Sequence, residues 1–130
     1  MKVLGIGVDI INNNRIKESI KSSKFNSRIY SRNEIQLYKK TKNKVAFFSK
    51  RFAAKEAFSK ALGTGFSSNL NFKDIEITND KKGMPRYVES KKIIKIVQKK
   101  YKIKKFNSFL SISDEKDYST AFTIIQSIWS

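Results

Sequence analysis

Residues 51–65, RFAAKEAFSKALGTG, decide how the rest of the sequence is interpreted. Alanine, phenylalanine and leucine recur there at helical spacing, which predicts a long amphipathic helix over residues 45–62. Gly63 follows the last apolar turn, where a glycine commonly caps a helix in a left-handed conformation. A central helix of this length is the element around which the other parts of the chain are expected to pack.

Two charged residues of this helix, Glu56 and Lys60, lie four residues apart on one stripe with Phe52, and Ser59 lies alongside. The opposite stripe is expected to face the core and consists of Ala54, Ala57, Phe58, Ala61 and Leu62. A Glu–Lys pair at this spacing is usually a solvated surface pair worth about 0.3–0.5 kcal/mol. Beside glycines, the same pair would also suit half of a site for a metal and phosphate oxygens.

The N-terminal segment contributes a second carboxylate. Residues 2–11 are largely apolar and predict a buried strand that ends near Asp9. The sequence GIGVD lacks the third glycine of a dinucleotide-binding motif, so we reject that function. A single aspartate here is most often a helix cap or a loop acid, but Asp9 and Glu56 could also share one Mg²⁺. Lys60 and Arg51 could then neutralise phosphate oxygens.

The remaining segments predict a mixed α/β fold of the α+β type, with a largely antiparallel sheet packed against the long helix. Ser31 followed by Glu34 matches a capping box and predicts a short helix. The chain length suits one domain, residues 1–130. The other expected elements are helices at 13–20 and 91–101, and strands at 72–78, 86–89, 109–113 and 120–127.

The composition excludes several kinds of chemistry. The 130 residues include no cysteine and no histidine, which excludes disulfides, thiol catalysis and imidazole bases. The formal net charge of +17 favours an anionic partner. A basic nucleic-acid-binding module is therefore the alternative hypothesis, although it leaves GIGVD and FAAKEAFSKALGTG unexplained.

Membrane attachment is not expected. No signal-peptide layout and no run of membrane-spanning length are present, which favours a cytoplasmic protein. The basic stretch KKIIKIVQKKYKIKK fits a core-packed helix better than a membrane surface. A second basic group, in the first helical region, is either a set of solvated side chains or a docking surface; it consists of Arg15, Lys17, Lys21, Lys24 and Arg28.

Four motifs together carry a family resemblance: GIGVDI, FFSKRFAAKEAFSKALGTG, FKDIEITNDKKGMP and SISDEKDYSTAFTII. In this order they resemble the holo-[acyl-carrier-protein] synthases, which are small bacterial 4′-phosphopantetheinyl transferases, over nearly the whole chain. The resemblance implies a Mg²⁺-dependent enzyme of fatty acid biosynthesis. It would transfer 4′-phosphopantetheine from coenzyme A to a serine of apo acyl carrier protein and release adenosine 3′,5′-bisphosphate.

The resemblance also implies roles for single residues. Asp9 and Glu56 would bind Mg²⁺, Asp9 would help to deprotonate the serine, and Lys60 would lie near the phosphates. The acidic carrier would dock on Arg15, with Lys21, Lys24 and Arg28 as helpers. Residues expected to line the coenzyme A site are Arg51, Ser59, Lys60, Gly63, Thr64 and Pro85.

The family is typically homotrimeric, with an active site at each subunit interface, and we expect neither nucleic acid nor membrane as a partner. One departure concerns the last motif, where many members have histidine in place of Asp114 and of Phe109. Other members carry the acidic pair Asp114–Glu115, so this is a variant within the family. Because no imidazole is available as a base, the resemblance assigns that role to Asp9.

Overall fold

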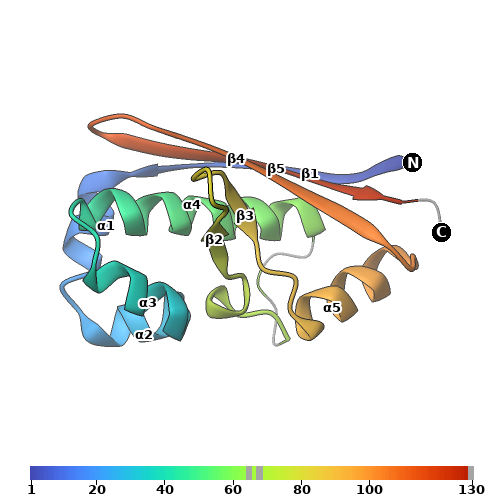
Figure 1. Ribbon diagram of the computed structural model, residues 1–130, viewed down its shortest axis with the longest axis horizontal. Coiled ribbons are helices and arrows are strands. Elements are labelled where there is room, and N and C mark those ends of the chain that lie inside the picture. The colour runs from blue at the N-terminus through green and yellow to red at the C-terminus, as the bar shows by residue number, and fades with distance from the viewer. Residues whose placement is uncertain (64–65, 67–68, 129–130) are drawn as a thin grey trace.

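A computed structural model describes residues 1–63, 66 and 69–128 of the chain. A sheet lies over the long helix α4, with three short helices below one end of α4 and helix α5 below the other (Figure 1). In chain order the elements are β1 (Lys2–Asn12), α1 (Asn13–Ser19), α2 (Ser23–Ile29), α3 (Arg32–Lys39), α4 (Lys44–Leu62), the 3-10 helix η1 (Phe72–Asp74), β2 (Ile77–Asn79), β3 (Pro85–Tyr87), α5 (Lys91–Tyr101), β4 (Phe106–Asp114) and β5 (Tyr118–Ser127).

The main sheet has the order β1-β5-β4, and both of its strand pairs are antiparallel. Strands β2 and β3 form a separate antiparallel hairpin, which crosses beside the middle of α4 in Figure 1. This arrangement confirms the predicted α+β fold with an antiparallel sheet against a long helix.

Helix α4 is buried on nearly every side, which corrects the prediction of an amphipathic helix with a polar stripe. Its alanines at positions 53, 54 and 57 are fully buried, and so is Phe58. Phe52, expected on the polar stripe, is also buried and stacks against Phe25 and Phe72. The sheet covers one side of α4 and the short helices and η1 cover others, so the helix forms the centre of the core.

Strand β1 has one buried and one exposed face, although its apolar sequence predicted a fully buried strand. Because successive side chains point to opposite faces, Gly7 and Ile11 face α4 while the alternate residues point outward. The outer face of the sheet is apolar, with side chains between 42% and 65% exposed. It is formed by Ile6, Val8, Ile10, Phe109 and Phe122.

The remaining predictions differ mainly in short elements. Helix α2 was not predicted; its N-cap is Ser22, which accepts a hydrogen bond from the backbone N–H of Phe25. The strand expected over 72–78 is replaced by η1 and the three-residue β2. The capping box of Ser31 and Glu34 is confirmed at the start of α3. Within the described residues, no helix has the length and apolar composition needed to cross a membrane.

Candidate active site

Two glycines bring β1 unusually close to α4. A Cβ atom placed on Gly7 would collide with the backbone carbonyl of Ala57, and one on Gly5 would collide with that of Ala61. Strand and helix can therefore approach only because both positions lack a side chain. The next inward-facing residue of β1 is Asp9, so this packing places its carboxylate against α4.

Lys60 forms an ion pair with Asp9, on another element. Its Nζ lies 3.1 Å from Asp9 Oδ1 and donates a second hydrogen bond, also 3.1 Å, to the carbonyl of Val8. The side chain of Lys60 is 53% exposed, whereas that of Asp9 is only 14% exposed. The lysine that the sequence pairs with Glu56 thus connects the end of α4 to β1 and remains open to solvent.

Glu56 lies close enough to Asp9 for the charges of the two side chains to interact. Partial burial raises the pKa of Glu56, and the neighbouring charge of Asp9 raises it further. The positive charges of Lys60 and Arg15 act in the opposite direction. The structure therefore brings together all three residues predicted to carry the chemistry, and it adds Arg15 of α1 to their electrostatic environment.

Paired carboxylates of this kind fit a hard cation. A cation that binds between two neighbouring carboxylates relieves the repulsion between their charges. Mg²⁺ takes oxygen ligands and commonly uses only one or two carboxylates, with water or substrate phosphates completing its shell. The described residues contain no group of three or more histidine, cysteine, aspartate or glutamate side chains that could enclose a metal. Asp9 and Glu56 therefore suit Mg²⁺ shared with a phosphorylated substrate.

A cavity of about 470 Å³ opens at the other half of α4 and contains two of the residues predicted to line the coenzyme A site. Arg51 and Pro85 both line it. Asp114 reaches the same cavity from the end of β4, and its carboxylate lies 4.0 Å from the Nζ of Lys50. The cavity thus combines two cationic side chains, Lys50 and Arg51, with the one acid Asp114.

The other predicted cofactor residues lie at the end of α4. Ser59 is buried, and its carbonyl accepts a 3.2 Å hydrogen bond from the N–H of Gly63. Gly63 caps the helix at φ 75°, as the sequence predicted. Thr64 is outside the described residues. Their contact with coenzyme A stays a prediction.

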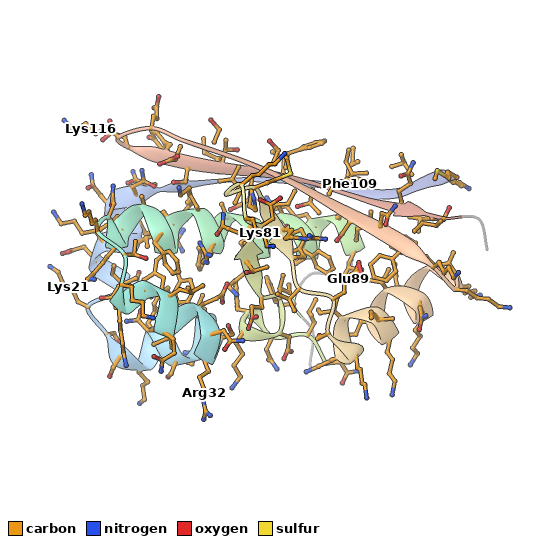
Figure 2. All side chains as sticks on the ribbon, in the orientation of Figure 1. Lys21, Arg32, Lys81, Glu89, Phe109 and Lys116 are labelled. Atoms are coloured by element: carbon orange, nitrogen blue, oxygen red, sulfur yellow. The ribbon has the colours of Figure 1, made fainter. Side chains whose placement is uncertain are left out.

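The predicted docking residues are all exposed on adjoining short elements at one end of the molecule. Arg15 lies on α1, Lys21 follows it, and Lys24 and Arg28 lie on α2. Figure 2 shows Lys21 pointing away from the body at this end. Lys21 also pairs with Glu18 at 2.7 Å, but both side chains remain well exposed. These four residues therefore form a cationic surface, and one of them, Arg15, also acts electrostatically on Glu56.

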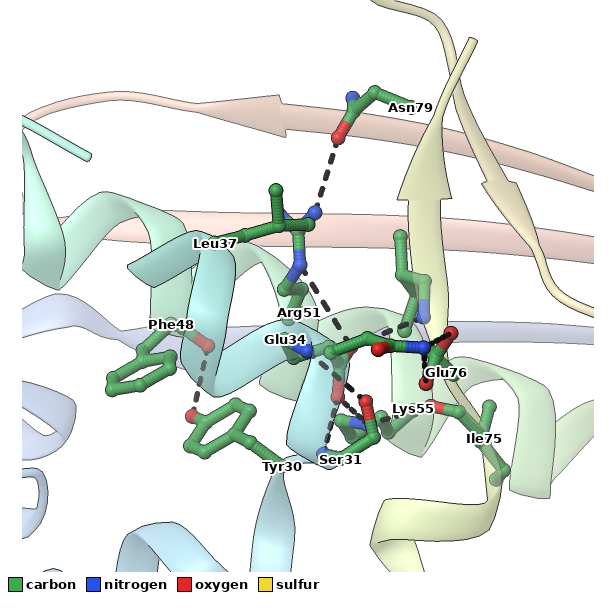
Figure 3. Close-up of polar contacts among 12 residues, drawn as sticks. Tyr30, Ser31, Glu34, Leu37, Phe48, Arg51, Lys55, Ile75, Glu76 and Asn79 are labelled. Carbon is green, nitrogen blue, oxygen red and sulfur yellow. Dashed lines mark hydrogen bonds and ion pairs between the residues drawn. The ribbon is translucent and has the colours of Figure 1, made fainter. Parts of the chain in front are cut away.

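One charged cluster was not predicted from the sequence. Glu34 of α3 and Lys55 of α4 are both fully buried, and the Lys55 Nζ lies 2.7 Å from Glu34 Oε1 (Figure 3). The capping box predicted the local role of Glu34 but not this partner. The two residues lie 21 positions apart, so no local pattern joins them.

Comparison with known protein families gives one match that covers most of the chain. Residues 5–123 match the model of the 4′-phosphopantetheinyl transferase superfamily. Holo-[acyl-carrier-protein] synthase of Pelagibacter ubique (strain HTCC1062) is 62% identical over 126 residues, which are 97% of this chain and 98% of that protein.

Solved structures agree with the sequence comparison. The holo-[acyl-carrier-protein] synthase of Neisseria meningitidis superimposes with a TM-score of 0.86 at 34% identity, over 96% of this chain and 99% of that one. That of Bacillus anthracis, in complex with CoA (3′,5′-ADP), gives a TM-score of 0.82 at 36% identity and covers 98% and 100% of the two chains. The match therefore extends over nearly the whole length of each relative.

Proposed function

The chain belongs to the 4′-phosphopantetheinyl transferase superfamily, and we propose that Asp9, Glu56 and Lys60 form the reacting end of its active site. It is a transferase that moves 4′-phosphopantetheine from coenzyme A to a serine of apo acyl carrier protein, in fatty acid biosynthesis. The observation that supports this site is the close packing of β1 on α4, which brings Asp9 to Glu56 and Lys60.

The metal in this proposal is Mg²⁺, held by Asp9 and Glu56. When bound, Mg²⁺ supplies a Lewis acid that polarises the pyrophosphate and stabilises the charge on departing adenosine 3′,5′-bisphosphate. Lys60, which is half exposed, is placed to hold a phosphate oxygen by its charge. A carboxylate oxygen of Asp9 would accept the proton of the serine hydroxyl, because the chain has no histidine to do so.

Coenzyme A would extend from this reacting end to the cavity lined by Arg51 and Pro85. The cavity's volume of about 470 Å³ is in the range of small-molecule sites. Arg51 supplies a fixed positive charge there, and phosphate recognition by arginine is strong because its guanidinium donates several hydrogen bonds. Ser59, Gly63 and Thr64 complete the proposed lining at the end of α4.

The carrier protein would dock on the cationic surface of α1 and α2. Arg15, Lys21, Lys24 and Arg28 are exposed there and complement an acidic partner. Arg15 also acts electrostatically on Glu56, so a carrier bound to Arg15 would present its serine near the metal ligands. This geometry supports docking at α1 over docking at the equally basic α5.

We further propose that the chain acts as one domain, forms a homotrimer and works in the cytoplasm. Among the described residues, one hydrophobic core cluster is shared by the sheet and α4, which supports one domain. The exposed apolar face of the main sheet supports oligomerisation, because monomers rarely leave so many large apolar side chains together in water. A trimer would cover this face and place each site beside a second subunit.

Intact-mass analysis of apo acyl carrier protein tests the function directly. The carrier is incubated with this protein, coenzyme A and Mg²⁺, and a parallel sample contains EDTA. We expect a mass gain of one phosphopantetheine that EDTA prevents. A carrier that stays unmodified by a well-folded enzyme would contradict the proposal, and a gain that persists in EDTA would contradict the role of the metal.

A further inference from the structure

The carboxylate of Glu34 lies at the centre of a fully buried polar cluster between α3, α4 and β2. Its Oε1 accepts hydrogen bonds from Lys55 Nζ at 2.7 Å and from the backbone N–H of Ser31 at 2.9 Å. Its Oε2 accepts one from the N–H of Ile77 at 3.0 Å. Figure 3 shows this carboxylate between Ser31, Lys55 and Arg51. We refer to Glu34, Arg51 and Lys55 as the buried cluster.

Lys55 is directed entirely into the protein. Besides Glu34, its ammonium group donates to the carbonyl of Ile75 at 2.6 Å and to that of Phe72 at 3.1 Å. An ammonium group has three protons, and these three acceptors account for all of them. Because Lys55 is fully buried, it has no donor left for a substrate, and its charge is matched to Glu34.

Arg51 is the second cation of the cluster, but its position differs. Its Nε lies 3.7 Å from Glu34 Oε2 and makes no hydrogen bond to any residue that the structure describes. Its terminal NH₂ group donates to Asn79 Oδ1 at 3.1 Å, and its guanidinium lies 3.8 Å above the ring of Phe47. It also lines the cavity proposed for coenzyme A, so its guanidinium lies at the cavity wall, and its ion pair with Glu34 is longer than that of Lys55.

The charges of the buried cluster do not cancel. One carboxylate, Glu34, faces two cations, and the closer cation is Lys55. Glu76 is the other acid that acts electrostatically on Arg51, but it is only half-buried and binds Asn33. Arg51 therefore keeps net positive charge beside the cavity because Lys55 has already neutralised Glu34.

We propose that Lys55 is a positioning residue that neutralises Glu34 and thereby keeps the charge of Arg51 available for a phosphate of coenzyme A. This inference rests on the proposed function, which places coenzyme A in the cavity at Arg51. Without Lys55, the nearest partner of Glu34 would be Arg51. Arginine and carboxylate readily form a two-pronged pair, which would turn the guanidinium away from the cavity and cancel its charge.

Two substitutions that damage the same cluster change its charge in opposite directions. Lys55→Met removes the cation, leaves Glu34 to Arg51 and is expected to weaken binding of adenosine 3′,5′-bisphosphate about tenfold. Glu34→Gln removes the anion and is expected to leave the Kd within about threefold of the wild-type value. The readouts are this Kd by calorimetry, the KM for coenzyme A and the KM for the carrier, which should not change.

The double variant Glu34→Gln/Lys55→Met serves as the rescue. It removes both charges and should restore the Kd to within about threefold of wild type. A merely structural role predicts instead that both single variants weaken binding, because each leaves an unpaired buried charge. Equal weakening by the two folded single variants would overturn the proposal. If Lys55→Met does not fold, the double variant tests the proposal by itself. Binding of adenosine 3′,5′-bisphosphate about tenfold weaker than in the wild type would then overturn the proposal.

Arg51→Ala separates this inference from the function on which it rests. It is expected to weaken binding of adenosine 3′,5′-bisphosphate at least as much as Lys55→Met does. If Arg51→Ala leaves the Kd unchanged, coenzyme A does not use this cavity wall, and both the placement and the inference are wrong. If Arg51→Ala weakens binding but Lys55→Met does not, the placement stands and only the inference is wrong.

Discussion

Two clusters of carboxylates and cations lie beside helix α4, and they differ in how much solvent reaches their carboxylates. The buried cluster surrounds Glu34 with three donors from Ser31, Lys55 and Ile77, and both Glu34 and Lys55 are fully buried. The open cluster, which we define as Asp9, Glu56 and Lys60, has two acids, a half-exposed lysine and a glutamate whose pKa is raised. The same residue types thus appear once around a fully buried carboxylate and once at a site that is open to solvent.

This difference indicates which cluster stabilises the fold and which cluster can bind a metal. A buried carboxylate with a full set of donors gains nothing from a ligand, and removing a partner mainly destabilises the fold. Carboxylates that repel each other at a half-open surface are stabilised by an added cation. The open cluster is therefore the better candidate for metal binding and catalysis, and the buried cluster for holding Arg51 in place.

The largest expected effect is the loss of transfer in Glu56→Gln. The substitution keeps the size of the side chain but removes a proposed metal ligand, so the rate should fall at least about a thousandfold, or about 4 kcal/mol of barrier. The rate is measured by intact mass of the carrier, and circular dichroism checks the fold. A folded variant with a rate near wild type would place the chemistry elsewhere.

The same substitution at the two clusters should change stability in opposite directions. Glu34→Gln leaves a buried lysine without its counter-ion and should lower the free energy of unfolding by about 3 kcal/mol. Glu56→Gln removes a disfavoured charge and should raise it by less than about 1 kcal/mol, because solvent screens this half-open site. Urea denaturation at neutral pH measures both. Equal losses at the two positions would remove the distinction between the clusters.

The difference in stability between the wild type and Glu56→Gln should depend on pH, because the pKa of Glu56 differs between the folded and the unfolded chain. The pKa of Glu56 is raised from its ordinary value of 4.5 in the folded chain. Between that value and the raised one, the folded state holds a proton that the unfolded chain releases, so wild-type stability falls as pH rises through this interval. The gain in Glu56→Gln should therefore appear above pH 4.5 and vanish below it. A gain of the same size at every pH would rule out this cause.

Gly7→Ala tests the packing that assembles the open cluster. The added Cβ collides with the carbonyl of Ala57, and such overpacking should cost about 2 kcal/mol of stability and move Asp9 away from Glu56. Gly63→Ala is the matched control, because its Cβ meets no atom of the described residues within 4 Å and the left-handed φ costs about 1 kcal/mol. Urea denaturation measures both variants. A Gly7→Ala protein with the same free energy of unfolding as the wild type would mean that strand and helix do not need this close approach.

Charge reversal compares the two basic surfaces. Arg15→Glu on α1 should raise the KM for the carrier about tenfold and reduce its dependence on salt, because a docking charge is reversed. Lys99→Glu makes the same change on exposed α5 and should leave the KM within about twofold. Equal effects of the two variants would indicate a general attraction between opposite net charges in place of docking at α1.

The sequence predicted the elements whose signals are local. The long helix, its Gly63 cap and the capping box of Ser31 depend on neighbouring residues, and all are found. The prediction of a strand over residues 72–78 was wrong for the first part of this segment. Its alternation is typical of a strand, but Asn71 and Asp74 close a tight turn there instead. Helix α2 was missed because its cap at Ser22 follows directly on the preceding helix.

The open cluster was predicted in its members but not in its pairing. The motif resemblance named Asp9, Glu56 and Lys60, yet the spacing joined Lys60 to Glu56, while in the fold it binds Asp9, which is 51 residues away. The partner of Lys55 was missed for the same reason. Contacts between distant segments depend on how strand and helix pack, and here that packing depends on Gly5 and Gly7.

The most direct test of the difference between the clusters is equilibrium binding of Mg²⁺ in the presence of coenzyme A, measured by calorimetry on three proteins. We expect the wild type and Glu34→Gln to bind one Mg²⁺ with similar affinity, and Glu56→Gln to bind it at least about tenfold more weakly. Unchanged Mg²⁺ affinity in folded Glu56→Gln, or loss of binding in Glu34→Gln alone, would contradict the assignment of the metal to the open cluster.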